Sequence, residues 1–214
     1  MKVKSHSIII NLEGANTLGD LSIPDKAKGL IIFCHGSGSS RKSPRNQHVA
    51  SVLNENGFAT LLFDLLTPEE DEIIENRFNI ELLSGRLVHV TLWALNDAGL
   101  KHLPIGFFGA STGAASALFA CVALQNKIKA LVSRGGRPDL ALPILDKVKT
   151  PVLLIVGSYD EEVIELNKLA YNKLNTVKEI KIIAGASHLF EEAGTLEEVS
   201  MHATNWFKQH LNIQ

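Results

Sequence analysis

Hydrophobic positions along the chain follow two patterns in turn. Apolar runs predict buried strands at residues 29–34, 58–66 and 105–108. Further runs that are mostly apolar predict strands at residues 128–132, 151–156 and 179–183. Between these runs, apolar residues recur three or four positions apart, as at Leu83, Leu87 and Val90, which predicts amphipathic helices. Strands that alternate with helices indicate an α/β fold with a doubly wound, mostly parallel sheet.

The first part of the chain has a different pattern. Residues 7–12 and 17–23 alternate between apolar and polar positions around a turn at residues 13–16, which predicts an antiparallel hairpin at the start of the sheet. The sequence contains no internal repeat, low-complexity tract or linker-like stretch. We therefore expect residues 1–214 to form a single domain without a large cap domain.

Two helices have recognisable ends. Ser43 and Pro44 have the identities of a helix cap and first helical residue, and Asn56-Gly57 is typical of the end of that helix. Thr195 and Glu198 have the spacing of a capping box, which predicts the start of the last helix.

Composition and charge narrow the possible partners and the location. A chain of 214 residues with 45% hydrophobic content can bury a sizeable core, and its net charge of −2 argues against a nucleic-acid or membrane partner. The first residues lead into only three consecutive isoleucines, too few for a secretory signal. Cys34 and Cys121 lie in apolar segments, so we expect buried free thiols and a cytoplasmic protein. Neither the composition nor the motifs of the sequence indicate an oligomeric state.

One motif carries a specific chemistry. Gly109-Ala110-Ser111-Thr112-Gly113 lies between an apolar run and a helical pattern, which is the context of a nucleophile elbow. Small residues two positions either side of the serine let the strand and the helix pass closely. Ser111 is then the predicted nucleophile, and the Thr112 N–H is a predicted oxyanion donor. A Gly-x-Ser-x-Gly sequence can also occur by chance. Its position between a predicted strand and a predicted helix favours the nucleophile elbow.

Partners for this serine are expected at the ends of later strands. Asp160 follows the run at 151–156 and His188 follows the run at 179–183, which gives the order Ser, Asp, His. A serine hydroxyl needs an imidazole to accept its proton, and the imidazole needs a carboxylate to orient it. Asp139 is the competing acid, and Asp160 also suits a helix cap. For His188, a surface role is the alternative.

Two loops complete the predicted site. His35-Gly36-Ser37-Gly38 follows the first apolar run, where a second oxyanion donor is expected, and the Ser37 N–H is the candidate. Gly36 would let the backbone approach the substrate. A phosphate-binding loop is disfavoured, because no Gly-Lys-Ser/Thr ending follows. Arg134 and Arg137 leave the run at 128–132 and either bind an anionic group of the substrate or brace Asp64 and Asp139.

Taken together, these motifs resemble the α/β-hydrolase superfamily across essentially the whole chain. The short length and the loop around Arg134-Gly135-Gly136-Arg137 look most like its dienelactone-hydrolase-related branch. This resemblance implies about eight strands, a Ser/Cys–Asp–His triad and no metal or organic cofactor. Dienelactone hydrolases have a cysteine nucleophile, whereas this chain has Ser111, so the resemblance implies an esterase that acts on another small ester.

The sequence therefore predicts a serine hydrolase that cleaves a small carboxylic ester through an acyl-enzyme intermediate. A lactonase, thioesterase or acyltransferase would use the same residues. A non-catalytic protein that binds a small molecule on a hydrolase scaffold is the alternative from another class.

Overall fold

A mixed sheet forms the centre of the computed structural model, which describes residues 2–12 and 14–211. Its eight strands have the order β1-β2-β4-β3-β5-β6-β7-β8. They are β1 (Val3–Leu12), β2 (Ala15–Pro24), β3 (Leu30–Cys34), β4 (Ala59–Phe63), β5 (Ile105–Ala110), β6 (Ile128–Arg134), β7 (Val152–Gly157) and β8 (Lys178–Ile183). β1 pairs antiparallel with β2, β2 pairs antiparallel with β4, and the remaining pairs are parallel. The predicted fold is confirmed; Glu13, in the predicted turn, lies outside the described residues.

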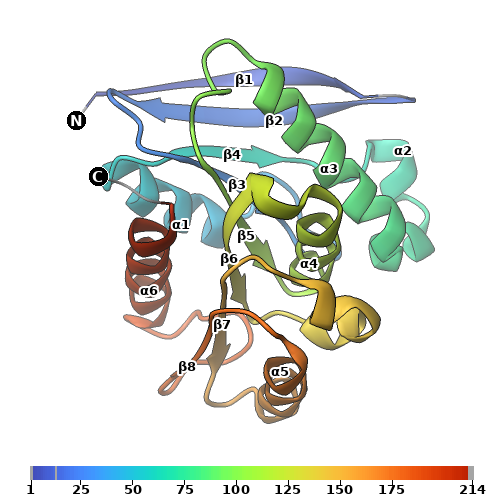
Figure 1. Cartoon of the computed structure of the whole chain (residues 1–214), viewed down its shortest axis with the longest axis vertical. Coiled ribbons are helices and arrows are strands. Elements are labelled where there is room, and N and C mark those ends of the chain that lie inside the picture. The colour runs from blue at the N-terminus through green and yellow to red at the C-terminus, as the bar shows by residue number, and fades with distance from the viewer. Residues whose placement is uncertain (1, 13, 212–214) are drawn as a thin grey trace.

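Helices cover both faces of this sheet (Figure 1). α1 and α6 lie on one face, and α3, α4 and α5 lie on the other. The α-helices are α1 (Pro44–Glu55), α2 (Pro68–Asp71), α3 (Ile80–Asn96), α4 (Thr112–Leu124), α5 (Glu161–Lys173) and α6 (Thr195–His210). Three 3-10 helices, η1 (Ile74–Phe78), η2 (Gln125–Lys127) and η3 (Pro138–Lys147), lie in the connections, and the sequence analysis did not predict them.

The sheet separates two apolar cores. On the side of α1 and α6, Phe33 of β3 and Phe108 of β5 pack with ring centroids 4.9 Å apart. On the other side, Phe107 of β5 packs among residues of α3 and α4, including Leu87 and Leu118. Burying each such side chain stabilises the fold by about 1.5–3 kcal/mol. The central strands are therefore fixed from both faces, and their carboxyl ends form a rigid edge.

Local capping follows the sequence in one place and departs from it in another. Ser43 caps α1 by accepting a hydrogen bond from the Asn46 N–H, as predicted. The capping box predicted at Thr195 is wrong, because Gly194 precedes α6 and the Thr195 hydroxyl donates to the Glu192 carbonyl instead. Gly194 has a φ of 83°, so the chain enters α6 through a left-handed residue that has no side chain to accept a bond.

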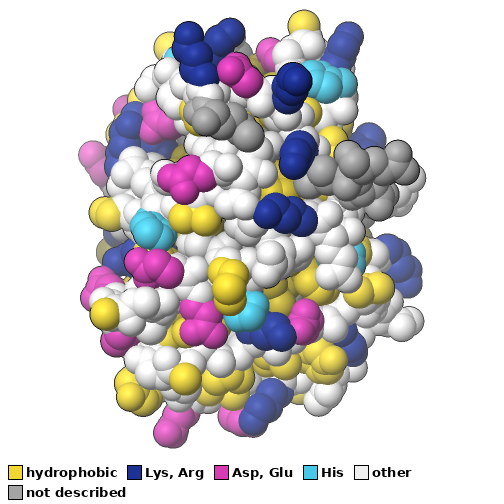
Figure 2. Space-filling model, turned by 90° about the vertical axis from the view of Figure 1, so that its left-hand side faces the viewer, with side chains coloured by type: hydrophobic (Ala, Val, Ile, Leu, Met, Phe, Trp, Pro, Cys, Tyr) yellow, Lys and Arg dark blue, Asp and Glu magenta, His cyan; other side chains and the backbone are white. Residues whose placement is uncertain are grey.

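One side of the molecule carries charges of both signs, and both cysteine thiols are buried. Basic and acidic side chains are interspersed on the side of the molecule where α1 and α6 lie (Figure 2). Cys34 and Cys121 are buried and unpaired, and burial raises the pKa of the Cys121 thiol to about 12. Within the described part of the chain, every helix is too short or too polar to cross a bilayer.

Candidate active site

Ser111 occupies a strained turn between β5 and α4. Its backbone dihedrals are φ 49° and ψ −125°, a conformation that a residue with a side chain rarely adopts. Backbone hydrogen bonds hold the turn: the Ser111 carbonyl accepts from the N–H groups of Ala114 (3.1 Å) and Arg137 (3.0 Å). The strained serine at the start of a helix is the geometry expected of a nucleophile elbow.

The two glycines of the motif allow strand β5, helix α4 and the loop after β3 to meet. A Cβ atom at Gly113 would lie 2.2 Å from the Cys34 carbonyl oxygen and 2.5 Å from that of His35. At Gly109 it would lie 2.6 Å from the Ala114 Cα. These neighbours are backbone atoms, which cannot turn away as a flexible side chain can. The motif therefore needs glycine at both positions for steric reasons.

Replacing Gly113 by alanine is expected to destabilise the protein by about 3 kcal/mol, near the upper end of overpacking effects. Urea unfolding followed by circular dichroism measures this change. Gly85→Ala in α3 is the matched control, because a Cβ there meets nothing within 4 Å and alanine favours a helix. Equal unfolding midpoints for Gly113→Ala and wild type would contradict the packing argument.

His188 and Asp160 lie together at the carboxyl ends of β8 and β7. The His188 Nδ1 atom is 2.5 Å from Asp160 Oδ2. Asp160 is the residue before α5, but its side chain makes no cap hydrogen bond, so the carboxylate is free to pair with the imidazole. The loops are tied to each other, since Tyr159 N–H donates to the Ala186 carbonyl at 2.9 Å and Gly185 N–H donates to Ser158 Oγ at 2.8 Å.

Asp139, the competing acid, has a different partner. Both of its carboxylate oxygens accept hydrogen bonds of 2.9 Å from Arg137. The same interaction raises the pKa of Arg137, the Asp139 hydrogen bond being the main cause. Asp64, the other carboxylate that Arg134 or Arg137 could have braced, pairs with Arg41 instead. Of the two candidate acids, the structure therefore brings Asp160 to His188.

Ser111 and His188 face one cavity of about 230 Å³. It lies where β3, β5, β6 and β8 end, the edge at which open α/β sheets bind ligands. In the described part of the chain, no hydrogen bond joins the Ser111 hydroxyl to the His188 ring. Such bonds are often long in structures without substrate and shorten in the complex. In this structure His188 is therefore bonded to Asp160, and Ser111 lines the same cavity as His188 without a hydrogen bond to it.

The loop after β3 is anchored by a neutral histidine. Burial lowers the pKa of His35. Its Nδ1 lies 3.0 Å from the Gly36 carbonyl oxygen, and its Nε2 accepts the Leu65 N–H at 3.0 Å, so the Nδ1–H tautomer satisfies both bonds. His35 thereby fastens the loop to the end of β4. A Cβ at Gly36 would lie 3.0 Å from the Ser111 Cβ, so only glycine lets this loop approach the serine closely.

The two predicted oxyanion donors differ in this structure. The Ser37 N–H donates to the Thr112 hydroxyl at 2.9 Å, so it already has an acceptor. The Thr112 N–H, at the first position of α4, makes no hydrogen bond among the described residues, as is usual for the start of a helix. The role of the Thr112 side chain was not foreseen from sequence, because the contact joins residues 75 positions apart.

The cavity wall also includes residues for which the sequence carries no recognisable motif. Of the two arginines that the sequence offered as anion-binding candidates, Arg134 lines the cavity, whereas Arg137 is not among its lining residues. Arg45 and Asn46, from the first turn of α1, lie in its wall together with Ser43. As the second and third residues of a helix, Arg45 and Asn46 carried no sequence motif that indicated a role in a site. The result is a small site with two arginines beside the serine.

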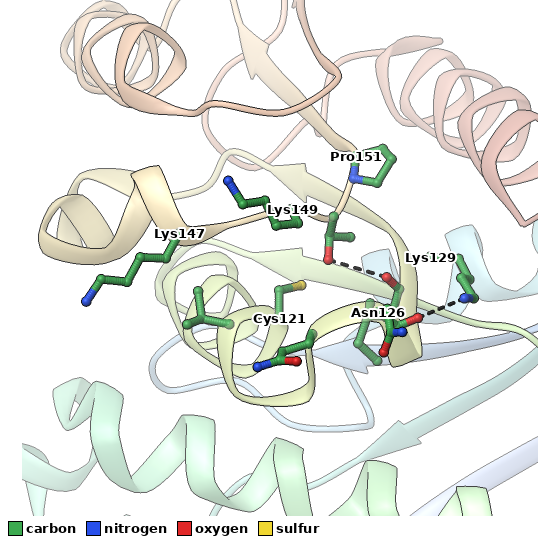
Figure 3. Close-up of a pocket in the computed structure, with 10 residues that line it drawn as sticks. Cys121, Asn126, Lys129, Lys147, Lys149 and Pro151 are labelled. Carbon is green, nitrogen blue, oxygen red and sulfur yellow. Dashed lines mark hydrogen bonds between the residues drawn. The ribbon is translucent and has the colours of Figure 1, made fainter.

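A larger cavity of about 660 Å³ lies at the opposite edge of the sheet, near the amino ends of β6 and β7 (Figure 3). Its wall includes Cys121 and three lysines, and the Lys129 ammonium group is bonded to the Asn126 carbonyl at 2.8 Å. Lys147 and Lys149 point away from Cys121 in Figure 3. Among the described residues, no hydrogen bond joins the Cys121 thiol to a basic side chain, so the larger volume of this cavity does not make it the better candidate for a reactive site. Within residues 2–12 and 14–211, no cluster of three or more His, Cys, Asp or Glu side chains could hold a metal ion.

Comparisons with known proteins identify the fold and the family. A crystal structure of a dienelactone hydrolase from Anabaena variabilis is 47% identical, covers 99% of this chain and 100% of its own, and superposes with a TM-score of 0.96. Est1E from Butyrivibrio proteoclasticus, with ferulic acid bound, is 19% identical over 95% of this chain and 99% of its own (TM-score 0.82), which supports the fold alone.

A curated relative carries a different name. A Mycobacterium tuberculosis protein named "Putative phosphoribosyl transferase" is 52% identical over 193 residues. The match covers 90% of this chain but only 44% of that relative, so the chain spans less than half of the relative's length. Residues 29–174 match the family described as alpha/beta hydrolase fold. This range includes the elbow, the loop after β3 and Asp160, and the chain belongs to the alpha/beta hydrolase fold family.

Proposed function

We propose that this protein is a serine hydrolase that cleaves a small carboxylic ester through an acyl-enzyme intermediate. The observation that carries this proposal is the strained Ser111 in one cavity with the bonded His188–Asp160 pair. Strain of this kind is retained where the surrounding structure holds a reactive group in place. The similar structure named a dienelactone hydrolase, which is 47% identical, is further support.

In the proposed reaction, Ser111 Oγ attacks the ester carbonyl while His188 Nε2 accepts the hydroxyl proton. Asp160 holds Nδ1 of the ring and stabilises its cationic form. The negative charge on the carbonyl oxygen is met by the Thr112 N–H and by the Ser37 N–H, which exchanges the Thr112 hydroxyl for the oxyanion. His188 then protonates the leaving alcohol, and water repeats the sequence to release the acid. A lactone or a thioester would enter the same steps.

A non-catalytic binding role is the second candidate. The hydrogen bond from the Ser37 N–H to the Thr112 hydroxyl favours this role. It leaves the Ser37 N–H unavailable to an oxyanion, which a protein that only binds its ligand does not need. The name of the Mycobacterium tuberculosis relative does not support a phosphoribosyl transferase activity for this chain, since more than half of that protein lies outside the match.

Reaction with a fluorophosphonate probe distinguishes the two candidates. We expect the native protein to be labelled at Ser111, as located by mass spectrometry of the peptides, because only a serine activated by a base attacks the phosphorus. The buried thiols of Cys34 and Cys121 cannot compete. Protein unfolded in urea is the control and should remain unlabelled. If the native protein also remains unlabelled while a known serine hydrolase reacts, the binding role stands instead.

A further inference from the structure

Arg134 is a buried cation with unused donors. It ends β6 with only 7% of its surface exposed and lines the cavity beside Ser111. Its Nη2 lies 3.4 Å from Asn46 Oδ1, and its Nε is buried without a hydrogen-bond partner. No carboxylate of the described residues lies within salt-bridge distance. Burial and the neighbouring Arg45 lower the pKa of Arg134 to about 10, so the guanidinium is still charged at neutral pH.

A second group of donors faces the same cavity. Arg45 lies in the first turn of α1, where Nη1 pairs with Glu191 at 2.9 Å and Nε is again buried without a partner. α1 has 12 residues, and its N-terminus carries a partial positive charge. Its first residue, Pro44, has no N–H, and Ser43 Oγ accepts the Asn46 N–H, so the Arg45 N–H is the donor of this turn that has no acceptor among the described residues. Ser39 and Ser43 add hydroxyl groups to the wall. Donors therefore reach the cavity from β6, from α1 and from the loop before α1.

We propose that this cavity binds the phosphate group of a small phosphorylated ester. A buried charge without a counter-ion is unfavourable, and an anionic ligand supplies the missing charge and acceptors. A phosphate monoester has three terminal oxygens for donors that arrive from three elements, whereas a carboxylate has two oxygens in one plane. Helix N-termini are established phosphate sites. The volume of about 230 Å³ is below the range of about 300–1,000 Å³ typical of drug-sized ligands, so the substrate is small.

This inference rests on the proposed function for the statement that the substrate is an ester. The phosphate takes no part in bond breaking and remains on the substrate. Water is added across the acyl C–O bond, and the products are a carboxylic acid and an alcohol, one of which carries the phosphate. Arg134 and Arg45 hold the phosphate and thereby position the ester carbonyl at Ser111.

Calorimetric titration with inorganic phosphate tests the site without any catalysis. The protein is the full chain with Ser111→Ala, compared with the same chain carrying Arg134→Gln in addition. We expect phosphate to bind the first protein, and binding to weaken by about tenfold or more in the second, because charged hydrogen bonds are lost. Lys42→Gln is the matched control: it also removes one positive charge, but Lys42 pairs with Asp20 outside the cavity.

The same titrations decide against the proposal if phosphate binding is unchanged by Arg134→Gln, or if acetate at equal ionic strength binds as tightly as phosphate. Circular dichroism establishes that each variant is folded, and Arg45→Gln provides a second test if Arg134→Gln is not. Since binding is measured on Ser111→Ala, phosphate binding together with a failed fluorophosphonate labelling would remove the hydrolase proposal and leave the phosphate site. Fluorophosphonate labelling of Ser111 without phosphate binding would remove the phosphate site and leave the hydrolase proposal.

Discussion

Replacing Ser111 by alanine is expected to lower kcat for p-nitrophenyl acetate by about 10⁴-fold or more, because loss of the nucleophile of a triad leaves only binding and oxyanion stabilisation. The methyl group occupies less space than the hydroxymethyl group and leaves the elbow backbone in place. The effect should therefore appear in kcat with little change in the free energy of unfolding. Steady-state kinetics and urea unfolding of the same preparations measure the two quantities.

Ser116→Ala is the matched control for this change. Ser116 lies on α4, five residues after Ser111, and its hydroxyl is buried without a hydrogen-bond partner and outside the cavity wall. Its removal should leave kcat within about twofold of wild type. A Ser111→Ala variant with wild-type kcat would end the hydrolase proposal, since the proposal makes the strained Ser111 the nucleophile that forms the acyl-enzyme.

Replacing Asp160 by asparagine is expected to lower kcat by about 10⁴-fold, because an amide cannot stabilise the cationic imidazole and favours the wrong tautomer of His188. The change keeps the size of the side chain, so the loops after β7 and β8 should remain in place. Ester hydrolysis at saturating substrate measures kcat, and circular dichroism checks the fold.

Asp139→Asn is the control for the acid assignment. Asp139 was the rival acid on sequence grounds and is bonded to Arg137 in the structure. Its replacement should change kcat by no more than a few-fold. The assignment would be reversed if Asp139→Asn abolished activity while Asp160→Asn retained it.

Much of the fold and the serine could be predicted from sequence, because both depend on local patterns. Buried strands are continuous apolar runs, and the elbow requires small residues at Gly109 and Gly113 whatever the rest of the chain does. Ser111, Asp160 and His188 follow the ends of parallel strands. Because the carboxyl ends of parallel strands lie at one edge of the sheet, these residues were expected to lie near one another.

Other features depend on contacts that spacing does not encode. Asp139 and Asp160 both follow strands, and their partners in the folded chain, Arg137 for Asp139 and His188 for Asp160, separate them. The Ser37–Thr112 bond joins a loop and a helix that the sequence places far apart. Arg45 looked like an ordinary helical residue, since the direction of a long side chain is set by tertiary packing.

The hydrogen bond between Ser37 and Thr112 has a consequence for substrate preference. The Thr112 hydroxyl occupies the Ser37 N–H in this structure. In the reaction proposed above, each turnover would therefore begin with a competition between this hydroxyl and the incoming carbonyl oxygen for the Ser37 N–H. A small neutral ester brings little binding energy to that exchange. An ester with a strongly held remote group can use that group's attraction to drive the exchange and complete the oxyanion site. Selectivity for the whole substrate would then depend on breaking the hydrogen bond between the Ser37 N–H and the Thr112 hydroxyl.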